Sequence, residues 1–429
     1  MVLIKKEVPV SGAYDVVVCG GGPSGFIGAI AAARGGAKVA IIERYGFPGG
    51  MATAGLVAPI SEFCFNGELV VGGIPWEFAR RLAESGGATI ERPQGSVCFN
   101  PEAYKLLAQR MLIEAGVDLY LHAYLTDCVM DSGRITHAVF ECKGGAKALE
   151  GRYFLDSTGD GDLSAMAGVP MQTFSAPTQP ASLCFCLGGV DATSLPKIRH
   201  DQQGVNYHIE PLREGLLPLS EQGAIPNFGG PWMCWMQSPN SVLVNMTRAE
   251  GDMVNEQDQT RLECLLREDA HRLVQALREN FEAFQDARIL YTATQVGVRE
   301  TRHIRGVHVL TGQEYAAAVH FPDAVGRGAH PIDIHSSSNG EQKCEFLKEA
   351  AYIPYRSLIA EDFPNLLVPG RCFSADREAS ASARVQASMM GLGQAAGFAA
   401  AQCAASNRSV QEADVELLRK TLIKIGSYI

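Results

Sequence analysis

The chain lacks several features that would place it in familiar classes of protein. Its twelve cysteines include no CxxC pair, which argues against structural zinc or iron–sulfur ligation. The formal net charge is −10 with no block of like charge, so we expect no nucleic-acid partner. No apolar run is long enough to span a bilayer, and the first residues do not resemble a signal peptide. We therefore expect a cytoplasmic protein with no membrane partner and no metal site.

The cysteines are scattered, and the closest pair is Cys184 and Cys186, within the apolar run 182–187. In a strand both side chains would lie on one face. Buried free thiols are the interpretation that this pattern favours.

What the chain does have is a strand, a glycine turn, a helix and a second strand near its beginning. An apolar run leads into a GxGxxG sequence formed by Gly20, Gly22 and Gly25. The first glycine permits the turn, the second lets the backbone approach a pyrophosphate, and the third lets the helix pack closely on the strand. This arrangement predicts a dinucleotide site, and the alternative is a similar fold whose turn holds no ligand.

The flanking residues sharpen this prediction. Pro23 and Ser24 open the helix, whose free N–H groups favour phosphate. The second strand, 39–42, ends at Glu43, where an acid that binds a ribose diol is expected. Because an acid here disfavours a 2′-phosphate, NADP is the least favoured ligand.

Three later segments could contact the same ligand. Glycines after the second strand would let the backbone pass under a long molecule, and Thr53 could donate to a phosphate or ribityl oxygen. The turn 158–162 could approach an adenosine group, although it could also be only a helix cap. The turn 370–376 and the small-residue helix 381–405 could reach the ribityl chain and a flat ring, or could be a solvated turn and ordinary helix packing. The candidate residues in these segments are Arg44, Gly49, Gly50, Met51, Ala52, Thr53, Gly159, Asp160, Arg371, Asp376 and Gly391.

The remaining pattern indicates a mixed α/β protein. We expect helices at 101–116 and 255–284, and strands at 118–123, 127–130, 135–141, 153–157, 241–247, 289–298 and 365–368. The segment 171–340 has a different texture, with many prolines and two of the three tryptophans. We therefore expect a discontinuous Rossmann-type nucleotide-binding domain over 1–60, 100–170 and 341–429, with an inserted α+β substrate domain over 61–99 and 171–340.

Several motifs occur together in a fixed order. After the first glycine turn come RYGFPGGMATAGLV, DSTGDGDL, GVRETRHIRG, PIDIH, YIPYRSL and NLLVPGRCFSADREASASARVQASMMGLGQAAG. With these motifs the chain resembles the FAD-dependent oxidoreductase family of the glutathione-reductase-like flavoproteins. It is distantly similar to the fumarate-reductase and tRNA-uridine-modifying flavoproteins.

The resemblance implies a glutathione-reductase type of fold and a noncovalently held FAD. It implies that Glu43 binds the adenosine ribose, that the first glycine turn binds the pyrophosphate, and that 49–53 and Asp376 bind the ribityl region. The segment 44–53 contains no histidine of the kind that links flavin covalently in succinate-oxidising relatives, and the chain has no second GxGxxG for NAD(P)H. The family is compatible with a homo-oligomer, and the identity of the small-molecule substrate does not transfer.

Candidate catalytic residues occur in two stretches. In 296–305, read as a strand, Arg299 and His303 would lie on one face. In the stretch 330–356, which begins at His330, Asp333 and His335 would also lie on one face as an orienting pair. A neutral histidine held by a carboxylate can accept a proton, which favours His335 or His303 as proton carrier.

The arginine forks suit an anionic substrate. Arg299 and Arg356 are expected to hold it or to neighbour the flavin. Tyr352 is a further candidate beside Arg356, although both could simply tie two domains together.

Three functions fit these observations. The leading one is an FAD-dependent oxidoreductase that oxidises or reduces a small organic substrate by hydride transfer at flavin N5. The others are a flavoprotein subunit of an electron-transfer assembly, and a dinucleotide-binding protein without redox turnover.

Overall fold

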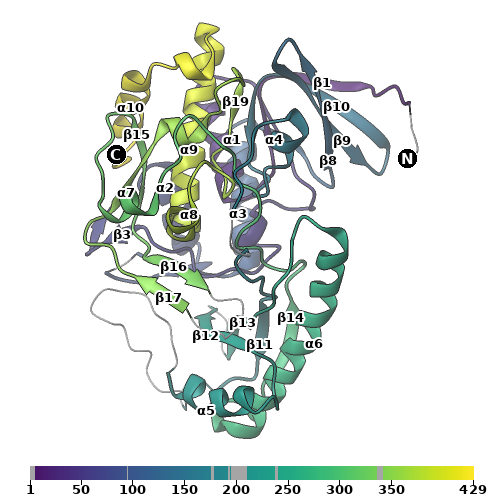
Figure 1. The fold of residues 1–429 in the computed structure, drawn as a ribbon, viewed down its shortest axis with the longest axis vertical. Coiled ribbons are helices and arrows are strands. Elements are labelled where there is room, and N and C mark those ends of the chain that lie inside the picture. The colour runs from purple at the N-terminus through teal and green to yellow at the C-terminus, as the bar shows by residue number, and fades with distance from the viewer. Residues whose placement is uncertain are drawn as a thin grey trace.

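The computed structural model describes residues 5–93, 95–174, 178–191, 194, 210–236, 240–335 and 342–429. Figure 1 shows two parts, a larger one around a mostly parallel sheet and a smaller one around a second sheet with the long helix α6 beside it. No helix in these ranges combines the length and the apolar character needed to cross a membrane.

The larger sheet has a parallel Rossmann-like centre. Its strands run in the order β7-β2-β1-β10-β9-β8, and β19 also pairs with β10. Strand β1 is parallel to β2 and β10, and Val18 lies opposite both Ile41 and Leu155. Since Val16, Val17, Val18 and Cys19 are fully buried, both faces of β1 are covered, as a central parallel strand requires. The strands are β1 (Val10–Cys19), β2 (Val39–Ile42), β7 (Asp118–Tyr120), β8 (Tyr124–Asp131), β9 (Arg134–Cys142), β10 (Gly145–Asp156) and β19 (Leu366–Leu367).

Helices α1 (Pro23–Arg34) and α9 (Gln386–Ser406) pack directly on each other beside this sheet (Figure 1). A Cβ added at Gly393 would lie 2.1 Å from the Ser24 carbonyl oxygen, and one at Gly397 would lie 2.2 Å from that of Gly28. Close packing of the two helices therefore explains the glycines at 393 and 397. The sequence had allowed either this packing or contact with a flat ring. Helices α2 (Ile74–Glu84) and α3 (Pro101–Glu114) contribute to the same core.

The smaller part has its own hydrophobic core. Its antiparallel sheet has the order β12-β13-β11-β14 and packs against α5 and α6. Asn255 caps α6 by accepting hydrogen bonds at 3.0 Å from the backbone N–H groups of Gln257 and Asp258. Cys184 and Cys186 belong to one cluster and Phe185 and Leu187 to another, so the predicted sharing of a face is confirmed. The elements are β11 (Phe185–Gly188), α5 (Glu210–Glu221), β12 (Phe228–Trp235), β13 (Ser241–Thr247), α6 (Glu256–Asn280) and β14 (Arg288–Thr292).

The remaining elements are short. The apolar side chains of 61–99, including Phe63, Phe78 and Phe99, belong to the same core as α1, although the sequence suggested the substrate domain for this segment. These elements are η1 (Gly50–Ala52), β3 (Cys64–Phe65), β4 (Glu68–Leu69), β5 (Ala88–Ile90), β6 (Val97–Phe99), α4 (Asp162–Ala167), η2 (Glu282–Phe284), α7 (Gly312–Ala316), β15 (Ala324–Gly328), β16 (Ile332–His335), β17 (Gln342–Glu345), β18 (Ala351–Pro354), η3 (Tyr355–Leu358), α8 (Arg377–Ala383), η4 (Val410–Glu412) and α10 (Val415–Lys424).

Two local predictions were wrong. The single helix expected over 381–405 is two helices, α8 and α9, separated at Val385, whose backbone is extended (φ −65°, ψ 150°). The strand expected over 296–305 is irregular and is held by isolated bridges at Gly297 and Ile304. In both places contacts from distant segments override the local propensity.

Candidate active site

A cavity of about 290 Å³ opens where the carboxyl ends of β1, β2 and β10 face the second sheet. This is the edge at which ligands bind in open α/β sheets. Among the residues named from the sequence, the lining includes Gly20, Gly22, Pro23, Ser24, Glu43, Arg44, Gly50, Met51, Gly159, Asp160, Arg299, His330, Asp333, His335 and Arg371.

The first glycine turn has the geometry that a phosphate site needs. Gly20 has φ +97°, and a Cβ there would lie 2.4 Å from the carbonyl oxygen of Ser157. A Cβ at Gly25 would lie 1.9 Å from the Gly20 carbonyl oxygen, so close packing requires glycine there, as predicted. A Cβ at Gly22, by contrast, would meet no protein atom closer than 3.9 Å. The backbone at Gly22 is therefore open to a ligand.

Glu43 is buried at the end of β2 and braces the turn. Its Oε2 accepts from the Gly21 N–H at 2.6 Å, and its Oε1 accepts from the Tyr45 N–H at 2.8 Å. Burial raises the pKa of this carboxyl, and the two backbone donors partly offset that effect.

The loop after β2 is tied to the first turn. The Gly49 N–H donates to the Gly21 carbonyl at 2.8 Å, and a Cβ at Gly50 would lie 2.7 Å from Gly22 Cα. The Thr53 hydroxyl donates to the Pro48 carbonyl at 3.0 Å and is buried. Gly50 and Met51 line the cavity, whereas Gly49, Ala52 and Thr53 shape the loop from behind.

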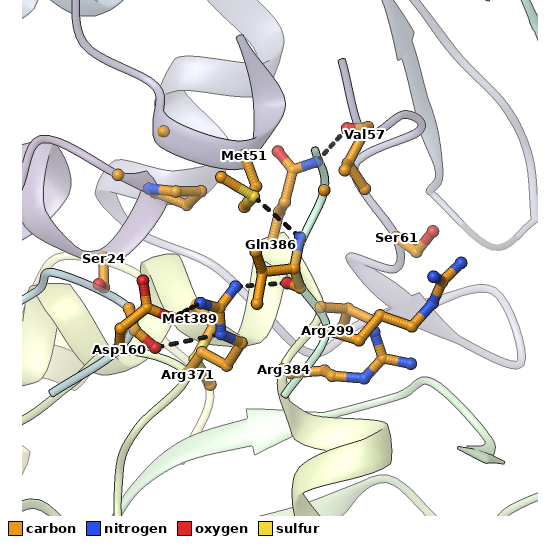
Figure 2. A pocket seen from close by; sticks show the side chains of 18 of the residues that line it. Ser24, Met51, Val57, Ser61, Asp160, Arg299, Arg371, Arg384, Gln386 and Met389 are labelled. Carbon is orange, nitrogen blue, oxygen red and sulfur yellow. Dashed lines mark hydrogen bonds and ion pairs between the residues drawn. The ribbon is translucent and has the colours of Figure 1, made fainter. Parts of the chain in front are cut away.

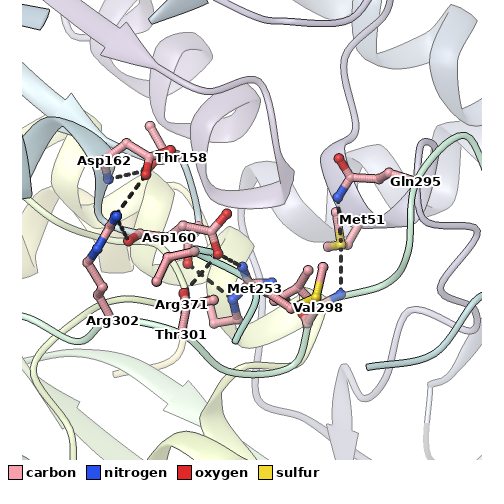
Figure 3. Close-up of polar contacts among 12 residues, drawn as sticks. Met51, Thr158, Asp160, Asp162, Met253, Gln295, Val298, Thr301, Arg302 and Arg371 are labelled. Atoms are coloured by element: carbon pink, nitrogen blue, oxygen red, sulfur yellow. Dashed lines mark hydrogen bonds and ion pairs between the residues drawn. The ribbon is translucent and has the colours of Figure 1, made fainter. Parts of the chain in front are cut away.

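A polar cluster joins two sites that are distant in sequence (Figure 3). Arg371 forms an ion pair with Asp160 and donates from Nη1 to the Val298 carbonyl and from Nε, at 3.1 Å, to the Gly159 carbonyl. The Thr301 hydroxyl donates to Asp160 Oδ1 at 2.8 Å. The turns 158–162 and 370–376 therefore meet at the cavity wall.

The lining fits the FAD expected from the sequence. Helix α1 begins at Pro23 with no side chain capping its N-terminus, so its first N–H groups are available to a pyrophosphate. Two buried polar atoms on the wall, Ser157 Oγ and Gln386 Oε1, have no hydrogen-bond partner within the described residues. Such groups are costly unless something pairs with them.

The other end of the cavity collects charged groups (Figure 2). Arg299 donates from Nη1 to the Pro180 carbonyl and to Ser182 Oγ, both at 2.7 Å, and burial lowers its pKa to about 9. Asp333 and His335 are paired at 2.9 Å, as the strand alternation predicted. Arg299 and Arg384 lie close together in Figure 2, on the opposite side from Arg371 and Asp160.

His330 presents a different arrangement from His335. Its Nδ1 lies 2.9 Å from the Pro331 carbonyl oxygen, which can only accept, so in the neutral ring the proton is on Nδ1. Nε2 is then a proton acceptor on a residue that lines the cavity. Burial lowers the pKa of this imidazole.

Other predicted residues lie elsewhere. His303 is fully buried, with Nδ1 at 3.2 Å from the Phe373 carbonyl oxygen and its ring against Phe174. Arg299 and His303 were expected to lie on one face of a strand, and this prediction was wrong. The segment 296–305 is irregular, and Arg299 lines the cavity whereas His303 does not.

Five further candidates lie outside the lining. The guanidinium carbon of Arg327 lies 3.9 Å from the ring centroid of Tyr352, and Arg356 forms a half-exposed ion pair with Asp323 at 2.9 Å. Asp376 caps α8, a Cβ added at Gly391 would meet only Val71 at 3.6 Å, and Gly25 packs against the first turn.

Trp232, Arg384 and Gln386 are among the lining residues that the sequence did not indicate as part of the site. The latter two flank the break between α8 and α9, where Gln386 Nε2 donates to the Val57 carbonyl at 2.7 Å. The only available signal was a pair of long polar side chains within a run of alanine, serine and glycine.

Comparison with known proteins finds a matching family, and also relatives that align with this chain over only part of their length. A family model described as FAD dependent oxidoreductase matches residues 15–422. Digeranylgeranylglycerophospholipid reductase 1 of Methanopyrus kandleri is 26% identical over 210 residues, covering 47% of this chain and 52% of the relative. Reductase 2 of the same organism is 26% identical over 182 residues, covering 40% and 43%. The matches thus span about half the length of these curated relatives.

A solved structure is similar over nearly the whole chain. A geranylgeranyl bacteriochlorophyll reductase-like protein from Thermoplasma acidophilum has a TM-score of 0.52 and 13% identity, and the alignment covers 96% of this chain and 84% of that one. At this identity the likeness concerns the fold alone.

Proposed function

Because this chain belongs to the FAD dependent oxidoreductase family, we propose that it exchanges a hydride between a small organic substrate and N5 of a noncovalently held FAD. One observation supports this best. A single cavity has the glycine turns and Glu43 at one end, and His330, Asp333 and Arg299 at the other. The bound flavin supplies two-electron chemistry that side chains cannot provide.

The cofactor residues divide by their role. The N–H groups of Ser24 and Gly25 and the open face of Gly22 would hold the pyrophosphate, and Glu43 would bind the adenosine ribose. Gly49 to Thr53 would form the wall beside the ribityl chain, and Arg371 would fix Asp160 and Gly159. The strand arrangement supports the glutathione-reductase type, because an antiparallel pair, β9 and β8, extends the parallel strands.

Proton transfer is assigned to His330 in this proposal. With FAD bound, the flavin would supply the two-electron step, and Nε2 of His330 would accept the proton that the substrate releases on oxidation and return it on reduction. His335 is less suited, since its Nε2 contacts Asp333 at 2.9 Å and its Nδ1 contacts Arg248 Nη2 at 2.8 Å. Arg299 on the wall supports a substrate that carries negative charge.

The test is an anaerobic half-reaction on the purified, FAD-loaded protein. Candidate metabolites are added singly, and the flavin absorbance is followed. We expect one equivalent of the true reductant to bleach one equivalent of flavin, while free FAD mixed with the same compound stays yellow. A folded protein that refuses added FAD would refute the proposal.

The complementary reaction tests the direction of catalysis. The flavin is first reduced chemically, and candidate acceptors are then added without oxygen. Activity of the isolated chain in either direction separates an enzyme from a subunit of an electron-transfer assembly, which would need its partner.

A further inference from the structure

Helix α9 projects beyond the start of helix α1 along the cavity wall. Gly393 of α9 packs against Ser24 of α1. Four residues later in both helices, Gly397 packs against Gly28, so the two helices run in the same direction. Gln386 is the first residue of α9, and the seven residues from 386 to 393 correspond to about 10 Å of helix. The first turn of α9 therefore lies past the N-terminus of α1, where the pyrophosphate is expected.

The side chain of Gln386 is fixed on this wall. Its Nε2 donates to the Val57 carbonyl at 2.7 Å (Figure 2). Because a carbonyl oxygen can only accept, the amide nitrogen must face Val57 and Oε1 must point away from it. The Val57 N–H in turn donates to the Met51 carbonyl at 2.9 Å. Gln386 thus joins the start of α9 to the loop that was assigned above to the ribityl region, which is the flavin half of the cofactor.

The amide oxygen of Gln386 is a buried acceptor in the lining. The residue is only 7% exposed, and its Oε1 has no hydrogen-bond partner within the described residues. Gln402, on the same helix, also donates to a backbone carbonyl and has an unpaired Oε1, but it lies outside the lining. An unpaired oxygen alone does not mark a ligand site. The position of Gln386 on the cavity wall is what distinguishes it.

The chemistry of the flavin ring complements this acceptor. The oxidised ring has a single N–H group, at N3, whereas its other ring nitrogens and its two carbonyl oxygens only accept. The C2 carbonyl lies next to N3, and the N-terminus of α9, which no side chain caps, can supply N–H groups to it. The start of α9 therefore offers both the donors and the acceptor that this edge of the ring requires.

Resting on the function proposed above, we propose that Oε1 of Gln386 accepts a hydrogen bond from N3–H of the flavin. Gln386 would then be a positioning residue, which fixes the pyrimidine edge of the ring at the start of α9. Its amide is neutral, so it pairs with N3–H without adding charge beside the ring.

The test compares two forms of the cofactor that differ at one atom. Apoprotein is titrated with FAD and with 3-methyl-FAD, in which a methyl group replaces the hydrogen on N3, and binding is followed by flavin fluorescence. We expect the parent to bind FAD about 5- to 150-fold more tightly, because 3-methyl-FAD leaves a buried acceptor unpaired.

Gln386→Met removes the acceptor and keeps a flexible side chain of similar length. It should weaken FAD binding by about 2- to 10-fold, the usual net effect of one neutral hydrogen bond. It should also bind the two flavins with affinities that agree within about twofold, a loss of discrimination that a purely structural role would not produce. Gln402→Met is the matched control and should discriminate between the flavins as the parent does.

The inference fails if the parent binds 3-methyl-FAD as tightly as FAD. It also fails if Gln386→Met discriminates as strongly as the parent, since another group would then contact N3. Both results leave the proposed function standing, because FAD is still bound, whereas a folded parent that binds neither flavin refutes the function together with the inference. The first comparison uses the parent alone, so it decides the inference even if Gln386→Met does not fold.

Discussion

Nε2 of His335 lies 2.9 Å from Oδ2 of Asp333, while its Nδ1 meets Nη2 of Arg248 at 2.8 Å. Both ring nitrogens are therefore engaged. Burial, reinforced by the charge of Arg299, lowers the pKa of His335 to about 3. This imidazole is neutral at pH 7 and orients its neighbours, while His330 keeps Nε2 available as an acceptor.

Substitution of His330 and substitution of His335 should have different effects on kcat and KM. We expect His330→Gln to lower kcat by about 10²- to 10⁴-fold, the usual contribution of a general acid or base. His335→Gln should mainly raise KM, because it releases Arg248 and Asp333 from their positions. Steady-state kinetics of both variants, each with its FAD content measured, checks this. A larger loss of kcat in His335→Gln would reverse the assignment.

The pH profile of substrate oxidation follows from His330. Burial lowers its pKa from the ordinary value of 6.5, with Asp333 opposing that shift and Arg384 adding to it. The ring accepts a proton only when neutral, so the rate should fall with decreasing pH only below 6.5. The profile of kcat, measured between pH 4 and 8, should lose this acid limb in His330→Gln. A limb above pH 7 would contradict the assignment.

The two glycines of the first turn should respond differently to alanine. A Cβ at Gly22 has no protein neighbour within 3.9 Å, so Gly22→Ala should leave the apoprotein as stable as the parent while weakening FAD binding. Overpacking commonly costs about 1–3 kcal/mol, which corresponds to about 5- to 150-fold in the Kd for FAD. Gly25→Ala, whose Cβ would lie 1.9 Å from the Gly20 carbonyl oxygen, should lose apoprotein stability as well. Flavin titration and thermal melts of both apoproteins distinguish these effects.

The cofactor half of the site was largely predictable, because its signals are local. The first turn, β2 and Glu43 follow one another within 24 residues, from Gly20 to Glu43, and the structure places them as the spacing indicated. The ordered motifs also gave the correct family. Helix α3 and strand β13 were located closely for the same reason, since their periodicity and flanking residues are contained in the segment itself.

The end of the cavity around Asp333 was only partly predictable, because long-range contacts build much of it. Arg384 faces the cavity only because the helix breaks at Val385, and no glycine or proline marks that break. Arg299 and His303 were expected on one face of a strand, yet no regular strand covers them; Arg299 lines the cavity, whereas His303 is buried beside Phe373 and Phe174. Side-chain alternation remained reliable at Asp333 and His335, where a regular strand exists.

The role that the sequence suggested for Arg356 differs from the position of this residue in the structure. The sequence favoured it as an anion anchor, whereas its half-exposed guanidinium pairs with Asp323 at 2.9 Å, away from the cavity lining. We expect Arg356→Ala to change KM by less than about twofold and stability by less than about 1 kcal/mol, as is usual for exposed pairs. Arg299→Ala, measured in parallel, should raise KM strongly. A rise in KM of orders of magnitude in Arg356→Ala would restore the original hypothesis.

His303 makes the protein sensitive to acid without entering the site. Burial lowers its pKa from 6.5 to about 4, so between these values the unfolded chain binds a proton that the folded chain refuses. The contribution of this group to the free energy of unfolding is therefore fully present above pH 6.5, and it is lost as the pH falls toward 4. The loss at pH 5 is about 2 kcal/mol, since each pH unit below 6.5 is worth about 1.4 kcal/mol. In His303→Asn, the fall in unfolding free energy between pH 7 and pH 5, measured by urea titration, should be smaller by about that amount. Because the comparison is made within each variant, any constant effect of the substitution on packing cancels, and an unchanged pH dependence would show that His303 is already protonated in the folded protein.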